Sequence, residues 1–391
     1  MGPRSEKLSP IDELCVVIIP SLEDYKYLQY FYREVLELAK EKGKKLFLYS
    51  PFGGSRAHNP FEILFLLLRR KACTGSRSIL HLHWIEFLYQ WRNNKYLILF
   101  TVPFMIVFFR FLRRFSKSRL FVTVHNILPH NIHWFAIEYS FFRIMLLELS
   151  DGVFVHNNLT KISLVNFYGV PGKKVHVIRH GFIGSKSFNR HQREEVRAKF
   201  NISKRDLVLF FIGAISDYKG IGILLEAVKE LFITEIGENL RLIIAGRTDK
   251  GYLRYLLETY NETLKDERVT FISKYLSEEE VNDIFNVTDF GICPYTRATT
   301  PSTILDFMHR KLPIITTDDP NVLDLIKNYP AIIAKRGDSH SLASCISFAY
   351  NQRAEYTKKA KAYDSKSLLD AWRISAEITL KSYMPSASGV V

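Results

Sequence analysis

The chain predicts an α/β protein made of two Rossmann-like, doubly wound domains, each a parallel sheet covered by helices. Short apolar runs alternate with amphipathic helical patterns in both halves, as expected for parallel sheets buried on both faces. A polar stretch, residues 181–192, interrupts this alternation near the middle of the chain. The length of 391 residues exceeds one typical hydrophobic core and fits two domains of similar size.

In the first half, six short apolar runs predict strands. They cover residues 14–19, 45–49, 79–83, 120–125, 152–156 and 175–179. The polar stretch that follows, GFIGSKSFNRHQ, has the composition of a linker. We therefore expect residues 1–185 to form the first domain.

The second half repeats the alternation, which predicts a second domain over residues 186–365. Ser277 with Glu280 predicts a capping box, and Thr300 is expected to cap a helix that begins at Pro301. A last helix, within residues 366–391, is expected to cross back onto the first domain. Two such domains would face a central cleft at the carboxyl ends of their strands. The strands are expected at residues 207–212, 241–245, 269–272, 290–294, 313–316 and 331–334.

The positive charge of the chain lies in its first half. Residues 1–190 contain 27 lysines and arginines against 13 aspartates and glutamates, whereas the remainder contains 27 of each. This imbalance fits nucleic acid, an anionic membrane or a phosphorylated acceptor. No nucleic-acid-binding motif is visible, so we expect no nucleic-acid partner. A hydrophobic content of 47% argues against wholesale disorder.

One apolar segment points to a membrane surface. Residues 96–109 (YLILFTVPFMIVFF) are uncharged but too short to span a bilayer, which takes about 20 residues. We interpret them as a helix that docks on an anionic membrane, and the alternative is a buried core helix. Residues 59–71 repeat the pattern and favour membrane contact. Five basic residues follow the first run: Arg110, Arg113, Arg114, Lys117 and Arg119.

The cysteines and the start of the chain indicate the compartment. The four cysteines fit no zinc or redox spacing and are expected to be reduced, buried thiols: Cys15, Cys73, Cys293 and Cys345. No secretory signal precedes the first strand. We expect a cytoplasmic protein, peripheral on the inner face of the membrane, that needs no metal or other cofactor.

The strongest functional signal is residues 208–228, VLFFIGAISDYKGIGILLEAV. They predict a strand, a glycine turn and a helix, with Lys219 and Gly220 at the helix start. Unpaired backbone N–H groups and the helix dipole favour an anion there, so Lys219 is a candidate phosphate clamp. The alternative is an ordinary βα unit with a solvated lysine.

A second helix start strengthens this prediction. Residues 299–302 (TTPS) open a helix directly after the strand ending at Pro294, so both helix starts are expected at one edge of the sheet. With Lys219 they would neutralise a diphosphate without a metal ion. Asp306 follows on an otherwise apolar stretch, where two ribose hydroxyls would satisfy its carboxylate. The alternative is an aspartate that interacts with its own helix dipole.

At this point the order of motifs resembles a known family. The segments VLFFIG, YKGIGILLEAV, LRLIIAG, VTFISKYLSEEEVNDIFNVTDFGICPYT and STILDFMHRKLPIITTD resemble the C-terminal half of GT-B fold nucleotide-sugar glycosyltransferases, especially glycosyltransferase family 4. In the first half, LHLHWIEFLYQ, FVTVHNILPHN, GVFVHN and VHVIRHG resemble a bacterial and archaeal branch of that family. The resemblance implies a GT-B fold whose second half binds the nucleotide-sugar donor.

Carried over residue by residue, the resemblance implies a donor site. Lys219 would bind the donor diphosphate, Asp306 would hold the nucleotide ribose, and His125 would contact the donor sugar or its leaving group. We assign His125 and Lys219 as catalytic. The other donor-binding residues would be Gly213, Ser216, Arg247, Thr300 and Ser302, with Ser273, Lys274 and Tyr275 beside the nucleobase.

Two positions depart from the family pattern. Ala298 stands where the first of two paired glutamates is usual. The arginine usual before the lysine is missing, because residues 214–216 (AIS) fill those places. Arg247 or Arg297 is a candidate to supply the missing phosphate charge.

Acceptor binding is expected at the end of the third strand. His83, Trp84 and Glu86 lie there, and a Trp face beside a carboxylate suits a sugar. Asn126 joins them as a candidate. The alternative is that Trp84 belongs to the core and Glu86 caps a helix. We expect only one of His81 and His83 to face the cleft. His130 and His133 are expected at the surface, and His180 to have a structural role.

The sequence thus predicts a hexosyltransferase that moves a sugar from a UDP- or GDP-sugar to a lipid-linked or polysaccharide acceptor. Resemblance to a retaining family implies that a phosphate oxygen receives the acceptor proton. With an inverting course, Glu86 or His125 would be the base. Two alternatives stay open: a nucleotide-sugar epimerase of the same fold, and a degenerate binding protein without turnover.

Overall fold

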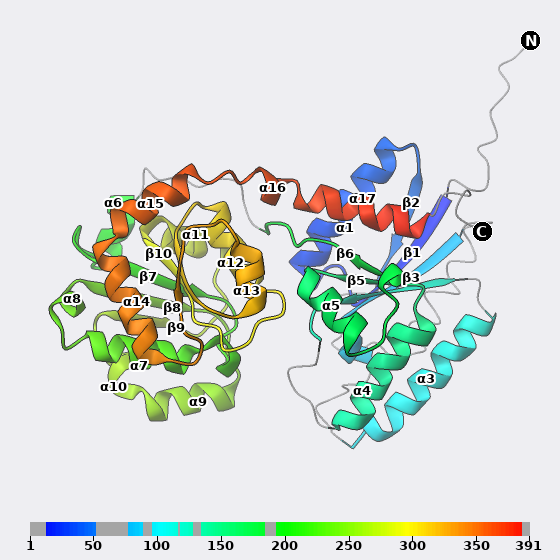
Figure 1. Ribbon diagram of the computed structural model, residues 1–391, viewed down its shortest axis with the longest axis horizontal. Coiled ribbons are helices and arrows are strands. Elements are labelled where there is room, and N and C mark those ends of the chain that lie inside the picture. Colours follow the sequence, from blue (N-terminus) through cyan, green and yellow to red (C-terminus); the bar gives the residue numbers. More distant parts are fainter. Residues whose placement is uncertain are drawn as a thin grey trace, which may run out of the picture. The chain divides into compact units, whose positions relative to one another are not determined.

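The computed structural model describes residues 13–51, 77–88, 96–115, 118–127, 134–183 and 193–384. The chain divides into two compact units (Figure 1): the first comprises Met1–Gly181 and Asp370–Val391, and the second Phe182–Leu369. Within the described residues, each unit holds one six-stranded parallel sheet with helices around it. The prediction of two doubly wound α/β domains is confirmed.

The first sheet has the strand order β2-β1-β3-β4-β5-β6. After β2 the chain crosses to the other side of β1, so the winding direction reverses between β1 and β3. Ligands of such sheets bind at the carboxyl ends of the strands beside this reversal. The strands are β1 (Glu13–Ile19), β2 (Lys45–Tyr49), β3 (Arg77–His83), β4 (Arg119–Val124), β5 (Gly152–Val155) and β6 (Val175–Val177).

The last helix of the chain belongs to the first unit. α1 packs along α17, and each helix buries an apolar stripe, which includes Phe31 and Val35 of α1 and Trp372 and Ala376 of α17. The helices are α1 (Lys26–Glu41), α3 (Ile98–Phe115), α4 (Phe135–Ile144), α5 (Asn158–Asn166) and α17 (Ala371–Tyr383), with short turns η2 (Ile85–Leu88), η3 (Met145–Leu149) and η4 (Gly172–Lys174).

Helix α3 contains most of the apolar run that we assigned to a membrane surface. One face packs into the core through Ile98, Val102, Met105, Phe109 and Leu112. The alternative of a wholly buried helix is nevertheless wrong, because Phe100 and Val107 on the other face are 75% and 66% exposed. Among the helices of the described ranges, none combines the length and apolar character needed to cross a bilayer. Residues 59–71 lie outside the described residues.

The second sheet has the order β12-β11-β10-β7-β8-β9, and its winding reverses between β7 and β10. Its strands are β7 (Leu207–Ile212), β8 (Leu240–Ala245), β9 (Val269–Ile272), β10 (Phe290–Cys293), β11 (Ile314–Thr317) and β12 (Ala331–Ala334). The longer helices are α6 (Arg193–Lys199), α7 (Ile221–Leu231), α9 (Lys250–Thr259), α11 (Glu278–Val287), α12 (Ser302–His309), α13 (Pro320–Ile326), α14 (Ser339–Asn351) and α15 (Arg353–Ala362). Shorter ones are η6 (Asp217–Lys219), α8 (Glu235–Glu238), α10 (Asn261–Lys265) and α16 (Lys366–Leu369).

The two predicted helix starts have different outcomes. The capping box of Ser277 and Glu280 is confirmed at the start of α11. The cap by Thr300 is wrong: Pro301, with ψ 66°, lies outside the helical region, so α12 begins at Ser302 without a side-chain cap. The Ser302 N–H instead donates to the Thr300 carbonyl at 2.8 Å. Of the described cysteines, Cys15 and Cys293 are buried as expected, whereas Cys345 is only half-buried.

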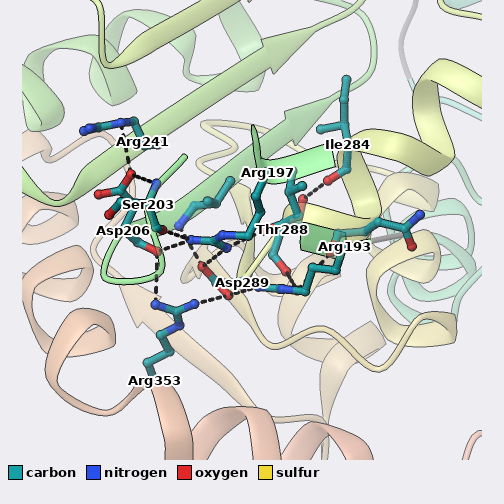
Figure 2. Close-up of polar contacts among 12 residues, drawn as sticks. Arg193, Arg197, Ser203, Asp206, Arg241, Ile284, Thr288, Asp289 and Arg353 are labelled. Carbon is teal, nitrogen blue, oxygen red and sulfur yellow. Dashed lines mark hydrogen bonds and ion pairs between the residues drawn. The ribbon is translucent and has the colours of Figure 1, made fainter. Parts of the chain in front are cut away.

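A buried carboxylate ties several elements of the second unit together (Figure 2). Asp289, at the start of β10, is 6% exposed. Its Oδ1 accepts hydrogen bonds from Arg193 Nη2 of α6 (2.6 Å) and Arg353 Nη2 of α15 (2.8 Å). Its Oδ2 accepts the Val208 N–H of β7 at 2.9 Å. One side chain therefore joins two helices to two neighbouring strands.

Replacing Asp289→Ala is expected to lower the free energy of unfolding by about 3–5 kcal/mol, because three guanidinium groups, those of Arg193, buried Arg197 and Arg353, lose their carboxylate. Urea unfolding measures the change. The control is Glu194→Ala, which removes only an exposed contact with Lys204 and should leave the midpoint unchanged. A loss below about 1 kcal/mol in Asp289→Ala would contradict this role of the carboxylate.

Candidate functional site

The candidate donor site lies where the second sheet reverses its winding. β7 and β10 are neighbours there, and the turn after β7 packs against the end of β10. Gly220, at the start of α7, has φ 73°, and a Cβ at this position would collide with the Pro294 carbonyl oxygen. Only glycine permits this close approach of two backbones. The Thr296 N–H also donates to the Tyr218 carbonyl at 3.0 Å.

Lys219 is held at this junction as a half-buried cation. Its Nζ lies 4.1 Å from the centre of the Tyr295 ring and 5.4 Å from that of Tyr218. Burial lowers the pKa of the ammonium to about 8. No carboxylate of the described residues lies within ion-pair distance of Lys219. The cation is therefore stabilised mainly by aromatic faces, an arrangement that an anionic ligand would improve.

Other predicted donor residues surround this turn. Gly213 follows β7 with φ 130°, and its carbonyl lies so close to Gly246 that a Cβ on Gly246 would collide with it. The Ser216 carbonyl accepts the Lys219 N–H at 3.0 Å. The carbonyl of Arg247 accepts the Ile215 N–H at 2.8 Å, which brings this exposed arginine beside the turn.

The second candidate arginine, Arg297, is also exposed and follows β10. Its positive charge opposes the rise that burial causes in the pKa of Tyr218, which places it near the Lys219 turn. Ala298, at the position of the missing glutamate, is anchored through its main chain. Its N–H donates to Asp319 Oδ2 at 3.2 Å and its carbonyl accepts from Asn321 Nδ2 at 2.8 Å.

Asp306 lies half-buried in α12, four residues after Ser302. Its charge opposes the fall that burial causes in the pKa of Arg310, so this arginine lies within electrostatic reach of the carboxylate. Burial raises the pKa of the Cys293 thiol to about 12. The charge of Lys219 lowers this pKa, and the charge of Asp306 raises it. The lysine and the aspartate thus both lie near the end of β10. A ligand is not required to explain Asp306.

The predicted nucleobase residues follow the edge strand β9. Ser273, Lys274 and Tyr275 are exposed, Tyr275 by 68%. Lys274 Nζ pairs with Glu280 Oε1 at 2.8 Å, and Glu280 also forms the capping box of α11. The main chain after β9 stays close to the turn after β8, because the Gly246 N–H donates to the Ile272 carbonyl at 3.0 Å. Thr300 and Ser302 lie half-buried at the start of α12.

In the first unit, histidines gather at the carboxyl ends of β3, β4 and β5. We expected only one of His81 and His83 to face the cleft side of the strand. This is wrong, because both rings lie on one face of the sheet. Residues i and i+2 of a strand point to the same face, and their ring centres lie 4.2 Å apart. Both rings are buried, and both contact the hydroxyl of Tyr32 on α1.

The hydrogen bonds of these rings fix their tautomers. His156 Nδ1 lies 3.1 Å from the Ile178 carbonyl, which only accepts, so this nitrogen carries the proton of the neutral ring. His156 Nε2 is then an acceptor and receives the Nδ1–H of His125 at 3.1 Å. His125 Nε2 in turn receives the Nδ1–H of His83 at 3.2 Å.

The same logic continues beyond His83. Its Nε2 must accept the only hydroxyl proton of Tyr32, at 3.1 Å. His81 Nδ1 lies 2.6 Å from the Tyr32 hydroxyl and also contacts the Tyr383 hydroxyl of α17. His81 Nε2 lies 2.8 Å from the Thr123 hydroxyl. These described groups form one hydrogen-bonded chain, and from Tyr32 to His156 every proton points toward Ile178. We call it the imidazole chain.

Burial keeps the imidazole chain neutral. It lowers the pKa of His81 and of His156 to about 3 and that of neighbouring His180 to about 4. The pKa values of His83 and His125 fall well below the usual range, chiefly through burial and then through the neighbouring histidines. Both ring nitrogens of His125 are hydrogen-bonded inside the protein, so it is not a free base for a substrate hydroxyl in this arrangement.

The expected acceptor residues adjoin the imidazole chain. Trp84 is half-buried rather than part of the core, has φ 53°, and stacks on His125 with ring centres 3.9 Å apart. Glu86 lies in η2, but its side chain is outside the described residues, as are His130 and His133. Asn126 is half-buried directly after His125.

Sequence reasoning missed four participants. Tyr27 and Tyr32 come from the aromatic run YKYLQYFY in α1, which was a visible signal. Tyr27 packs edge-on against His125 with ring centres 5.0 Å apart. His156 ends the predicted strand 152–156 as His125 ends 120–125, which was also a visible signal, whereas Tyr383 had none. No group of three or more metal-ligating side chains in the described part of the chain has a geometry that would hold a metal ion.

Comparison with known protein families shows what the sequence of the second unit is similar to. Residues 192–366 match the family model described as "Glycosyl transferases group 1". This segment makes up most of the second unit. The match covers the unit that contains Lys219, Asp306 and the winding reversal between β7 and β10. The resemblance to group 1 glycosyl transferases expected from the motifs is thus confirmed.

Solved structures extend the similarity to both units. A glycosyltransferase from Rickettsia africae matches 96% of this chain and 100% of its own, with a TM-score of 0.70 and 14% identity. The Anabaena protein HepE, in a complex with UDP and glucose, matches 94% of this chain and 99% of its own, with a TM-score of 0.64 and 14% identity. These matches confirm the GT-B fold class.

A curated relative matches over a smaller share of both chains. The chitobiosyldiphosphodolichol beta-mannosyltransferase of Candida albicans is 26% identical over 252 residues, which is 58% of this chain and 53% of the relative. The present chain therefore spans about half the length of this curated relative.

The imidazole chain makes the stability of the first unit sensitive to acid. Below pH 6.5 the imidazoles become protonated in the unfolded chain but stay neutral in the folded protein. The free energy of unfolding therefore falls with pH until the pH approaches the folded pKa values of about 3 to 4. Each histidine contributes about 1.4 kcal/mol per pH unit. Urea unfolding between pH 7 and pH 5 measures this loss.

The transition of the second unit serves as the internal reference for this experiment. A matched variant is His340→Gln, which removes an exposed histidine paired with Glu230 and should leave the pH profile unchanged. A first-unit stability that stays flat between pH 7 and pH 5 would show that the rings are not buried in the neutral form.

Proposed function

We propose that the protein is a glycosyltransferase that moves a hexose from a UDP- or GDP-sugar to a lipid-linked or polysaccharide acceptor. The observation that carries the proposal is Lys219, a half-buried cation without a carboxylate partner among the described residues. It lies at the winding reversal of the sheet whose sequence matches the group 1 family. Diphosphates bind at such reversals.

Donor binding would use the turn after β7. With a pKa of about 8, Lys219 is mostly protonated at pH 7 and would neutralise the negative charge that grows on the departing diphosphate. The amino ends of α7 and α12 would add backbone N–H donors and their dipoles. Gly213, Ser216, Thr300 and Ser302 would line the phosphates, with Arg247 or Arg297 as a second cation.

The remaining donor contacts follow the resemblance. Asp306 would hold the ribose, and Ser273, Lys274 and Tyr275 would flank the base. The donor is proposed to bind without a metal ion. HepE, which shares the fold, has been solved with UDP and glucose, and this supports a uridine nucleotide as the first donor to test.

The proposed chemistry follows a retaining course. The acceptor oxygen bonds to the anomeric carbon, the bond from that carbon to the diphosphate breaks, and a diphosphate oxygen takes the acceptor proton. The imidazole chain supports this assignment over a base mechanism through His125, because both nitrogens of that ring are already hydrogen-bonded. His125 would act as a positioning group for the sugar or its leaving group.

Acceptor binding is proposed at the carboxyl edge of the first sheet. Trp84 offers a half-buried ring, and Asn126 follows directly after His125, on which that ring stacks. Glu86 stays a candidate acceptor residue from the sequence. His83, the fourth proposed acceptor residue, is 1% exposed and would act through its neighbours. A lipid-linked acceptor is supported by the name of the Candida albicans relative, a diphosphodolichol mannosyltransferase.

Attachment to the cytoplasmic face of an anionic membrane is proposed to occur through α3. Its outer face exposes a stripe of large apolar side chains: Phe100, Phe104, Val107 and Phe111. Arg114 follows this stripe in the last turn. Arg113, by contrast, forms a two-pronged ion pair with Asp151 at 2.8 and 3.0 Å, so it serves the fold. The apolar stripe therefore carries the membrane proposal.

The donor site is tested by Lys219→Ala. UDP binding to the native protein should raise its thermal midpoint by mass action, and the variant should lose this shift because the diphosphate loses its cation. Thermal-shift measurements with UDP, GDP and ADP give the readout. Lys229→Ala, on the exposed face of the same helix α7, is the matched control and should keep the shift. A full shift in Lys219→Ala would remove this lysine from the site.

Turnover separates the three open functions. Slow release of free sugar from the donor without acceptor supports a transferase, inversion at a ring carbon of the donor supports an epimerase, and binding without either product supports a degenerate protein.

Membrane attachment is tested by sedimentation with vesicles that contain anionic phospholipid. The double variant Phe100→Ser and Val107→Ser should lose most binding, because it removes the two most exposed apolar side chains of α3. Phe167→Ser is the matched control, since Phe167 is 76% exposed at the end of α5 in the same unit. Equal loss in both proteins would show that the α3 stripe has no special role.

A further inference from the structure

A second cationic site lies at the edge of the second sheet opposite to Lys219. A cavity of about 750 Å³ opens there, at the amino ends of β10 and β11. Thr288 and Asp289 precede or begin β10, and Lys311 and Leu312 precede β11, whereas Lys219 and Tyr295 follow strand carboxyl ends. The strands are parallel, so the cavity and the candidate donor site belong to opposite edges of one sheet.

The lining of this cavity carries a strong excess of positive charge. Five basic residues line it, and Asp289 is its one acidic residue among those described. Both carboxylate oxygens of Asp289 are already occupied, by Arg193, Arg353 and the Val208 N–H. The basic residues are Arg193, Lys311, Arg353, Lys358 and Lys361.

The lysines retain donors for a ligand. Lys311 Nζ donates to the Lys361 carbonyl at 3.2 Å, which keeps this ammonium beside α15. Neither Lys358 nor Lys361 forms an ion pair with any described residue. Two ammonium groups thus border the cavity with their charge uncompensated, in contrast to Lys359 on the same helix, which pairs with Glu355.

Helix α15 presents these groups from one rigid face. Arg353, Thr357, Lys358 and Lys361 occupy positions i, i+4, i+5 and i+8, which lie on one side of a helix. Asp289 anchors the start of this helix through Arg353 (Figure 2). The Thr357 hydroxyl adds a polar group between the charged side chains. The site is therefore built on a fixed element rather than on loose surface lysines.

We propose that this cavity binds a phosphate-bearing ligand, at a site separate from the donor site. Guanidinium and ammonium groups are the donors that phosphate oxygens prefer. The volume lies within the range of small-molecule pockets, so it accommodates a phosphorylated sugar or a nucleotide as well as a lipid headgroup. The proposal does not depend on the proposed transferase activity, because it uses none of the residues assigned to it.

The test measures inorganic pyrophosphate binding by isothermal titration calorimetry at a fixed chloride concentration. The Lys219→Ala variant removes the donor-site cation and should still bind pyrophosphate. Adding Lys358→Ala and Lys361→Ala to that variant should weaken the remaining binding at least tenfold. The matched control adds Lys204→Ala and Lys265→Ala instead, two exposed lysines that do not line the cavity. These substitutions are at the surface and are expected to leave the thermal midpoint unchanged.

Two results would overturn the proposal: loss of all pyrophosphate binding in Lys219→Ala alone, or equal weakening by the cavity and control pairs. A second arm identifies the source of the phosphate. Vesicles with anionic phospholipid are sedimented with the α3 variant Phe100→Ser and Val107→Ser, with and without the cavity substitutions. If the α3 variant still binds vesicles and the cavity substitutions abolish that binding, the ligand is a lipid headgroup. If the cavity binds pyrophosphate but the cavity substitutions do not change vesicle binding, the ligand is a free phosphorylated molecule.

Discussion

The candidate donor site depends on one contact between backbones, that of Gly220 with the Pro294 carbonyl. This contact forms because Gly220 adopts a left-handed conformation and has no side chain to keep the strands' ends apart. It brings the turn after β7 over Tyr295, and Lys219 is then forced to place its ammonium on that ring instead of in water. The lowered pKa of the lysine follows from the same burial. A single glycine thus helps to set the position of the proposed phosphate clamp and the burial that lowers its pKa.

The first unit solves a different problem, that of burying four histidines close together, with a fifth, His180, half-buried beside them. Buried polar groups persist in proteins when each has a partner, and charged imidazoles this close would repel one another. The Ile178 carbonyl can only accept, so it sets the direction of the hydrogen bonds from His156 back to Tyr32. Tyr383 contacts His81 from α17, 302 residues away along the chain, so the last helix is part of the polar core of the first unit. Rings whose nitrogens are all hydrogen-bonded inside the protein have no free nitrogen with which to exchange a proton.

Local patterns were sufficient to predict the elements but not their polar partners. Apolar runs gave the strands to within about two residues, and the glycine turn identified Lys219. The sequence could not show that Arg110 and Arg113 pair with Glu148 and Asp151, because those pairs join α3 to segments far along the chain. The partners of the histidines were hidden for the same reason. The error at His81 and His83 was one of geometry, since strand periodicity places both on one face.

Net charge also differs between the two halves of the chain in a way that does not match the two anion sites that we propose. The first half of the chain holds the whole excess of positive charge, yet Arg110 and Arg113 are already engaged in ion pairs with Glu148 and Asp151. The remainder of the chain is neutral by composition, but five of its basic residues line one cavity, and two of them, Arg193 and Arg353, are held there by Asp289. The carboxylate that stabilises the fold thereby leaves positive charge in excess around it. A recognition site can therefore arise as a by-product of a buried ion pair, in a part of the chain whose composition gives no sign of it.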